Sequence, residues 1–206
     1  MTREVVILTK SVMNGGWCTA GLDISSGKWL RLVADINHAP LSNRHLLGIK
    51  PLDAVSVELV REIPFRNHTE DCVIKESFGE ILRPIGQYTI EQAIKLRTPA
   101  AEGFIFGNDA ESITEDEMSA FGFTHSLEFV EVRQLVVNYS RKKAEFEFSG
   151  RHYAGISITD PDFIMDDGFV GGSVGHGGAY LVISMPAFPD RRSKRYHKFA
   201  AKIFLK

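Results

Sequence analysis

Two tryptophans and a nearby arginine are the side chains of this sequence best suited to binding a ligand. Trp17 and Trp29 are the only tryptophans, and Arg31 follows the second of them by two positions. An indole ring gives any nucleobase a flat surface on which to stack, and a guanidinium group contacts phosphate or stacks as a cation. These residue types predict contacts with single-stranded nucleic acid or with a nucleotide.

Further cations stand in two other places. Lys10 and Ser11 precede the pair Gly15-Gly16, so a polar turn could hold a phosphate there, and an ordinary solvated turn is the alternative. The run RRSKRYHK at 191–198 interleaves cations with aromatic rings, as nucleic-acid contact loops do, and a charged connecting loop is the alternative. The cations expected to touch the backbone of a bound strand are Lys10, Arg191, Arg192, Lys194 and Arg195.

A β-hairpin over 17–35 would position the tryptophans and the arginine. Residues 25–27, Ser-Ser-Gly, have the composition of a three-residue loop with Gly27 in the left-handed conformation, so that Ile24 would pair with Lys28. That register places opposite one another, on the core face, Leu22 and Leu30, Ala20 and Leu32, and Cys18 and Ala34. Both tryptophans and the arginine then share the other face. The alternative use of that face is packing against the second barrel or against a protein partner.

No other group of residues matches a known catalytic or metal-binding pattern. The seven histidines have no zinc spacing, and two cysteines are too few for a thiolate site, with Cys18 expected to be a buried, inert thiol. One acidic cluster lacks the spacing of a calcium loop: Asp160, Asp162, Asp166 and Asp167. The glycine-rich segment 171–178 precedes a strand rather than a helix, which favours a mobile connection over a phosphate cradle. We therefore expect no catalytic residue, no metal and no cofactor.

Composition and charge indicate an ordinary folded protein. Hydrophobic residues make up 44% of the chain and charged residues 24%, which argues against disorder. A net charge of -2 argues against a protein that coats duplex DNA through charge alone. The first residues, MTREVVILTK, lack the pattern of a secretory signal, and no apolar stretch approaches membrane-spanning length. A cytoplasmic protein without a membrane partner is expected.

The order of strand-like and helical segments predicts the architecture. Alternating apolar and polar residues recur at both ends of the chain, whereas helical signals are confined to the middle. Capping boxes that begin at Thr89 and Thr114 predict short helices over 89–97 and 114–121. We expect a mainly β protein of two small β-barrels joined by a short helical segment. The expected bounds are 1–85 for the first barrel, 86–125 for a helical and acidic connector, and 126–206 for the second barrel.

Three segments of the chain resemble the bacterial dual-OB domain family. They are TKSVMNGGWCTAGLDISSGKWLRLV at 9–33, SITDP at 157–161, and LVISMPAF with HKFAAKIF between 181 and 204. The resemblance implies two OB-like barrels and a role in binding nucleic acid or a nucleotide, without an established reaction. Within these segments the residues that resemble more than scaffold are Thr9, Lys10, Ser11, Trp29 and Arg31. The loop 171–178 departs from the family pattern and is expected to be specific to this protein.

These observations predict a non-enzymatic module that binds single-stranded nucleic acid or a nucleotide. The expected ligand contacts are Lys10, Ser11, Trp17, Trp29, Arg31, Arg191, Arg192, Lys194 and Arg195. Two alternatives stay open: a module that binds a protein through the same aromatic face, and an enzyme that acts on a nucleotide through Asp160 and His176. Binding that weakens strongly with salt would indicate nucleic acid. Association that does not change with salt would indicate an apolar protein interface, and metal-dependent turnover would indicate an enzyme.

Overall fold

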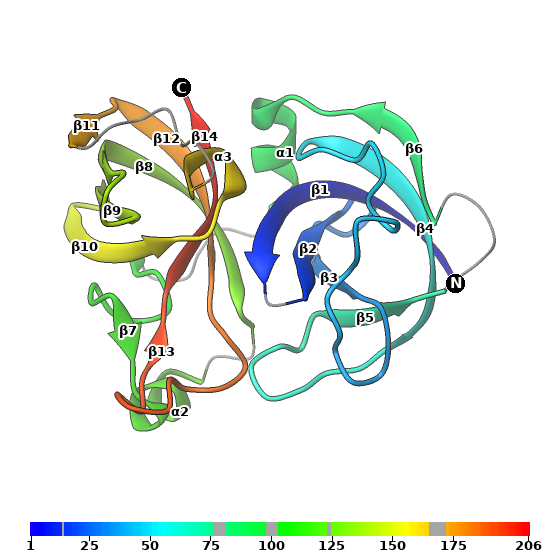
Figure 1. Ribbon diagram of the computed structural model, residues 1–206, viewed down its shortest axis with the longest axis horizontal. Coiled ribbons are helices and arrows are strands. Elements are labelled where there is room, and N and C mark those ends of the chain that lie inside the picture. Colours follow the sequence, from blue (N-terminus) through cyan, green and yellow to red (C-terminus); the bar gives the residue numbers. More distant parts are fainter. Residues whose placement is uncertain (14, 76–80, 98–102, 123–124, 165–171) are drawn as a thin grey trace. The chain divides into compact units, whose positions relative to one another are not determined.

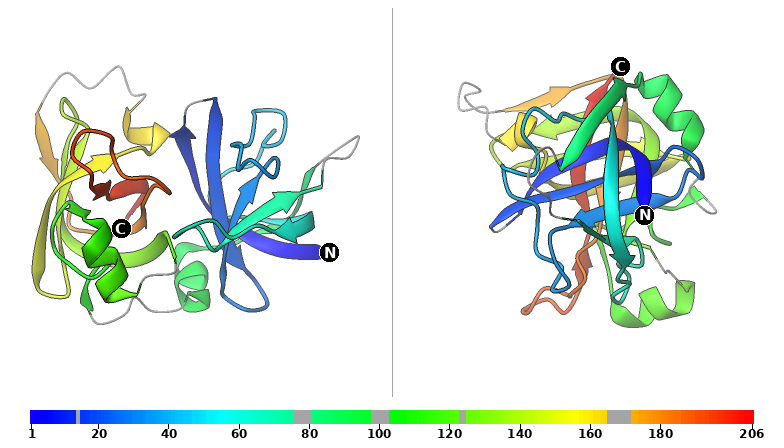
Figure 2. Two further views of the ribbon diagram at one scale, coloured as in Figure 1. Left: turned by 90° about the horizontal axis from the view of Figure 1, so that it is seen from below. Right: turned by 90° about the vertical axis from the view of Figure 1, so that its right-hand side faces the viewer.

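The chain forms two β-rich units. The computed structural model describes residues 1–13, 15–75, 81–97, 103–122, 125–164 and 172–206. The compact units are Met1–Thr98 and Pro99–Lys206 (Figure 1), and in each of them the strands curl round into a ring (Figure 2). The prediction of a mainly β protein with two small barrels is confirmed. No helix in the described ranges is long and apolar enough to cross a membrane.

Five strands close the first barrel. In chain order they are β1 (Thr2–Met13), β2 (Gly16–Asp23), β3 (Trp29–Val33), β4 (Asp53–Glu62) and β5 (Asp71–Ile74). Strand β1 pairs with β2 and β4, β3 pairs with β2 and β5, and β4 closes the ring by pairing with β5. Of these pairings, the one between β3 and β5 is parallel and the others are antiparallel. A further strand, β6 (Leu82–Gln87), pairs with β4.

The second barrel repeats this order of strands. Its ring consists of β8 (Leu127–Asn138), β9 (Lys143–Phe148), β10 (Arg151–Ile158), β12 (Gly178–Ser184) and β14 (Phe199–Leu205). Strand β8 pairs with β9 and β12, β10 pairs with β9 and in parallel with β14, and β12 pairs with β14. The other strands of this unit are β7 (Ser112–Ile113), β11 (Ser173–Gly175) and β13 (Tyr196–His197). Both rings therefore have the Greek-key order of an OB barrel, and the strands correspond one to one.

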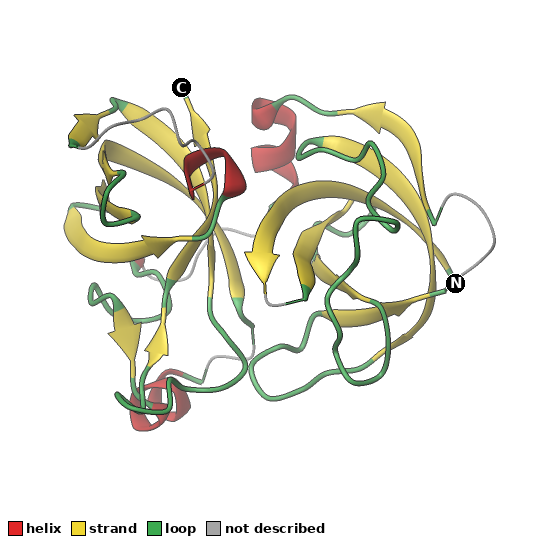
Figure 3. Ribbon diagram, in the orientation of Figure 1, coloured by secondary structure: helices red, strands yellow, loops and turns green. Residues whose placement is uncertain are grey.

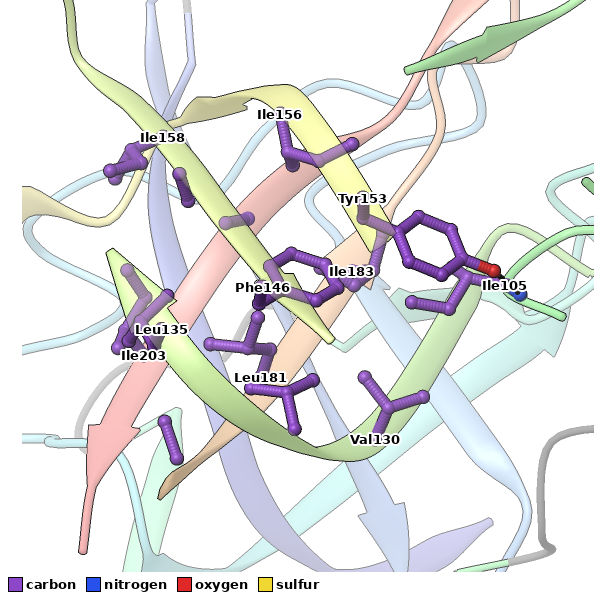
Figure 4. Close-up of a cluster of buried hydrophobic side chains, with 14 of the residues drawn as sticks. Ile105, Val130, Leu135, Phe146, Tyr153, Ile156, Ile158, Leu181, Ile183 and Ile203 are labelled. Atoms are coloured by element: carbon purple, nitrogen blue, oxygen red, sulfur yellow. Dashed lines mark hydrogen bonds between the residues drawn. The ribbon is translucent and has the colours of Figure 1, made fainter. Parts of the chain in front are cut away.

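Alternating apolar side chains fill each ring. In the first unit the buried cluster includes Ile7, Leu30 and Leu32. In the second unit the rings of Phe146 and Tyr153 stack with centroids 5.3 Å apart (Figure 4). The hydroxyl of Tyr153 accepts the backbone N–H of Ile105 at 2.9 Å, which ties the segment before β7 to the core. Burial raises the pKa of Tyr153, so this hydroxyl stays protonated at neutral pH.

Both predicted helices form, and both carry their capping boxes. They are α1 (Ile90–Leu96) and α2 (Glu115–Phe121), and in each the threonine before the helix exchanges hydrogen bonds with the residue three positions later. These signals are local in sequence, so they are readable without the tertiary structure. Helix α1 lies in the first unit and α2 in the second. A single-turn helix, α3 (Pro161–Ile164), was not predicted.

The predicted hairpin forms from β2 and β3, but its register was wrong by one residue. Leu22 lies opposite Trp29 and Ala20 opposite Arg31, rather than opposite Leu30 and Leu32. The reason is the turn. The carboxylate of Asp23 accepts the backbone N–H groups of both serines at 3.0 and 2.8 Å, and the backbone N–H of Asp23 donates to the carbonyl of Lys28. The loop thus holds four residues, 24–27, and Gly27 does take the predicted left-handed conformation, with a φ of 68°.

The corrected register changes which side chains share a face. Residues directly opposite one another point to the same side of a sheet, and a slip by one residue moves one strand's side chains to the other side. Trp17 therefore lies on the inner face, where it packs against the core, while Trp29 and Arg31 lie on the outer face. The prediction that both tryptophans share one face was wrong. Cys18 lies on the outer face, half-buried beside Arg31, and not in the core.

Part of the glycine-rich segment 171–178 is strand rather than loop. Ser173–Gly175 forms β11, which pairs antiparallel with residues 136–138 of β8. The prediction of a plain mobile connection was wrong for these three residues, because the free edge of β8 beyond its pairing with β12 accepts them as a further strand. Gly171 lies outside the described residues, as do Asp166 and Asp167 of the acidic cluster.

Candidate functional site

A cluster of charged and aromatic side chains gathers on the outer face of β3 and β5 in the first barrel. Two loops cover this face, residues 34–52 between β3 and β4 and residues 63–70 between β4 and β5, and Figure 3 draws both in green. The parallel pairing of β3 with β5 places Arg31 directly opposite Asp71. Residues that are distant in the sequence thereby meet at one strand pair.

Arg31 is the buried cation of this cluster, and two carboxylates lie beside it. Only 6% of the residue is exposed, and its guanidinium lies 3.4 Å from the carboxylate of Glu70 and 3.4 Å from that of Asp71. It also donates to the sulfur of Cys18 at 3.6 Å. Burial on its own disfavours the charge, but the neighbouring thiol and the two carboxylates outweigh it and raise the pKa of Arg31. Arg31 therefore lies on the expected face, where it holds two carboxylates in place.

Asp71 in turn orients a histidine. Its side chain is 1% exposed, one oxygen lies 2.6 Å from Nδ1 of His38, and the other lies 3.8 Å from Nδ1 of His68. Burial raises the pKa of Asp71, and the charges of Arg31 and His38 oppose that shift. An ionised Asp71 only accepts, so in that state Nδ1 of His38 is the donor and Nε2 is left to interact with a ligand. The side chain of His38 is 26% exposed, which makes such contact feasible.

Two loops present the exposed part of the cluster. The carboxylate of Asp35 accepts two backbone N–H groups, at 2.8 and 3.2 Å, in the turn that carries His38, and His38 itself has a left-handed φ of 61°. In the second loop Phe65 and His68 exchange two backbone hydrogen bonds, so that Arg66 lies at the tip of a tight turn. Phe65 and His38 bring their rings to a centroid distance of 5.1 Å, and the guanidinium of Arg66 lies 5.9 Å from the ring of Phe65. We call Phe65, Arg66 and His38 the loop platform.

Lys10 and Trp17 form a second, separate group at the end of β1 and the start of β2. The ammonium of Lys10 lies 5.3 Å from the centroid of the Trp17 ring and donates to the carbonyl of Ile49 at 3.1 Å. The indole N–H of Trp17 donates to the side-chain oxygen of Asn43 at 2.5 Å. Partial burial lowers the pKa of Lys10, and the charge of Asp53 opposes that shift. These two predicted residues do lie together, on the opposite face of the sheet from Trp29 and Arg31.

The other predicted contacts are dispersed. Ser11 is buried, with 4% exposed, and Trp29 is half-buried on the outer face. Arg191, Arg192 and Lys194 are exposed in the tight turn that follows Asp190, whose carboxylate accepts backbone N–H groups of that turn. Arg195 instead donates to the hydroxyl of Ser112 at 2.7 Å and lies 3.6 Å from Glu117. This basic turn belongs to the connection from β12 to β14, which corresponds to the connection from β4 to β5 in the first barrel.

The residues considered for catalysis or metal binding belong to the second unit, whereas the cluster on β3 and β5 belongs to the first. Asp160 is fully buried, accepts the backbone N–H of Ile203 at 2.8 Å and lies 3.2 Å from the ammonium of Lys202. The described residues show no contact between Asp160 and His176. Within the same ranges, no three His, Cys, Asp or Glu side chains are placed to hold a metal ion.

Sequence reasoning missed His38, Phe65, Arg66 and Asp71. The available signals were weak: Asp35 and Asn37 around His38 are typical of a turn, and an aspartate at the start of an apolar run is unusual. Their convergence depends on the parallel pairing of β3 with β5, which no local pattern reveals.

A family model described as "Dual OB-containing domain" matches residues 3–203. No curated protein and no solved structure matches the chain.

Proposed function

The chain belongs to the dual OB-containing domain family, and we propose that it binds single-stranded nucleic acid or a nucleotide, without catalysing a reaction. OB barrels bind oligonucleotides on the face of their second and third strands, bordered by the loop after the first strand and the loop before the fifth. In the first barrel these strands are β2 and β3, and the loop before the fifth strand is residues 63–70.

The observation that supports the proposal most is the loop platform. Aromatic and imidazole rings stack on bases of any sequence, and an arginine beside them contacts phosphate or adds a cation to the stack. Phe65 and Arg66 supply two of these groups on the loop before the fifth strand, which borders the ligand face in OB barrels, and His38 supplies the third from the loop between β3 and β4. Asp71 holds His38 in one orientation, and Arg31 stabilises Asp71, so Arg31 acts as a positioning residue. Weak binding with little sequence preference follows, because few side chains are placed to read base edges.

The remaining predicted contacts extend this proposal. Trp29 lies on the same outer face as Arg31 and offers a further stacking surface. Lys10 and Trp17, next to Ser11, would contact the nucleic acid where β1 ends and β2 begins. In the second barrel Arg191, Arg192 and Lys194 would contact phosphates, and Arg195 would hold their turn.

Replacing Phe65 with alanine should weaken binding of an oligo-dT or oligo-rU strand by about 1–3 kcal/mol, the usual cost of losing one stacked base. Arg66→Ala should weaken binding to both strands alike, because a phosphate contact carries no sequence information. The measurement is fluorescence anisotropy with oligo-dT, oligo-rU and a duplex. The matched controls are Phe121→Ala and Arg83→Ala, which remove an exposed aromatic and an exposed cation elsewhere. Undetectable binding to every nucleic acid at low salt would favour the protein-interaction alternative.

Removing the three exposed cations of the basic turn should flatten the salt dependence of binding. Each phosphate contact to a single strand contributes about 0.7 to the slope of log K against log salt, so the triple change of Arg191, Arg192 and Lys194 to alanine should reduce the slope by about 2. The control is a triple alanine variant of Lys28, Arg83 and Lys95, which are exposed and change the net charge equally. An equal reduction in both variants would show that net charge, and not this turn, sets the slope.

A further inference from the structure

The second barrel carries a pocket over strands that correspond to β1, β2 and the start of β3 in the first. Its volume is about 310 Å³, and it lies over β8, β9 and the start of β10. Strands β9 and β10 are the second and third strands of this ring, the same position that β2 and β3 occupy in the first. The polar side chains that line it are Gln134, Glu145, Glu147, His152 and His176.

An irregularity in β8 shapes this pocket. Arg133 lies opposite Glu147 and Val136 opposite Glu145, so β8 has two residues, 134–135, where β9 has one. Gln134 has a left-handed φ of 50°, and the carbonyl of Leu135 accepts the backbone N–H of His176 at 2.6 Å. Bulges and left-handed non-glycine residues cost free energy and concentrate at binding sites. The β11 segment thus closes one side of the hollow that the bulge opens.

The charge of the pocket is negative. Side chains alternate between the two faces of a strand, and Ala144 and Phe146 of β9 are buried in the core. Glu145 and Glu147 therefore point outward. In the described parts of the chain, neither carboxylate has an ion pair or a hydrogen bond. The Nε2 atom of His176 is shielded from solvent and also lacks a hydrogen-bond partner within those parts. A ligand that brings hydrogen-bond donors would satisfy both carboxylates, and it would also satisfy Nε2 of His176 in the tautomer that leaves this nitrogen unprotonated.

We propose that this pocket binds a small organic cation, an alkylguanidinium or alkylammonium group. Ionised carboxylates only accept hydrogen bonds, and a guanidinium can donate to two acceptors at once. The amide oxygen of Gln134 and the imidazole of His176 add neutral acceptors, while Leu135 and Val136 offer aliphatic surface to an alkyl chain. A phosphate group would meet two negative charges here, and neither forms an ion pair within the described residues. The pocket therefore has a charge preference opposite to that of the loop platform in the first barrel.

The test is a titration of the full chain with butylguanidinium, followed by ¹H–¹⁵N NMR. Butylurea, which has the same shape without the charge, is the matched control ligand. Butylguanidinium should shift the backbone signals of Gln134, Glu147 and His176 with a Kd in the millimolar range, which is about what a ligand of this size can reach. Equal shifts with butylurea, or shifts that lie outside the pocket, would overturn the proposal.

Variants then decide whether the carboxylates are responsible. Combining Glu145→Gln with Glu147→Gln should weaken butylguanidinium binding by at least about tenfold, whereas Glu4→Gln, an exposed glutamate of the first barrel, should leave it unchanged. Glu145→Gln alone, at an exposed position, gives a second reading if the double variant does not fold. Unchanged affinity in a folded Glu145→Gln, Glu147→Gln protein would reject a cation site. An end-blocked tripeptide with a central arginine tests where the cation comes from. Tighter binding of the tripeptide than of butylguanidinium would identify the natural ligand as an arginine side chain of a protein, and weaker binding would identify it as a free small cation.

Discussion

Arg31→Ala is expected to lower the free energy of unfolding of the first barrel by about 3–5 kcal/mol, the cost of leaving buried charges without their partner. The change would remove the guanidinium that lies 3.4 Å from both Glu70 and Asp71, and Asp71 is 1% exposed. Urea unfolding followed by tryptophan fluorescence would measure it, because both tryptophans belong to this unit. Arg83→Ala, at an exposed position, is the control and should cost less than about 0.5 kcal/mol.

The effect of Arg31→Ala should also depend on pH. Burial raises the pKa of Asp71 above that of an unfolded chain, so this carboxyl favours the native state most when protonated, below its ordinary pKa. The stability that protonated Asp71 contributes is lost as the pH rises through the pKa of Asp71 in the folded protein. More stability is lost when Arg31 is absent, because the ionised carboxylate then has no guanidinium beside it. The destabilisation should therefore be smaller at pH 4 than at pH 7. A destabilisation that does not change between these pH values would show that lost packing, and not the unpaired carboxylates, causes it.

Asp160→Ala should destabilise the second barrel by about 3–5 kcal/mol, again because one partner of a buried ion pair is lost. Asp160 is fully buried, and its carboxylate accepts from Lys202 and from the backbone N–H of Ile203. Lys202→Met should cost a similar amount, since it leaves the buried carboxylate without its cation. Thermal unfolding by circular dichroism would measure both.

The double variant of this pair provides the control. Asp160→Asn combined with Lys202→Met removes both charges, keeps an oxygen for the N–H of Ile203, and should recover much of the loss, as neutral replacements of buried pairs often do. A cost in the double variant equal to the sum of the costs of Asp160→Asn and Lys202→Met, each measured singly, would show that the two residues do not act as a pair.

The parts of the fold that depend on neighbouring residues could be predicted from the sequence. The capping boxes at Thr89 and Thr114 involve residues three positions apart, and both helices form where they were expected. The hairpin of β2 and β3 was also predictable, but its register was not. That register depends on the side chain of Asp23, which accepts hydrogen bonds from the turn and so adds one residue to the loop.

The loop platform and its supporting charges could not be predicted in the same way. Arg31 and Glu70 are separated by 39 positions, and the parallel pairing of β3 with β5 brings them together. The periodic pattern of apolar residues in the sequence does not indicate which strands pair in parallel. The sequence identified Arg31 as unusual, yet its partners became visible only in the closed ring.

The parallel pairing of β3 with β5 also has a kinetic consequence. This pairing joins the last strand of the ring to the third, so it forms only after the intervening chain has been brought back on itself, a slow step in the folding of β-rich proteins. Arg31 and Asp71 meet at this pairing, so a chain whose ring has not closed has no oriented His38 to offer. A ligand of this site would then bind the native state and not the unfolded chain, and would retard unfolding by holding the ring shut.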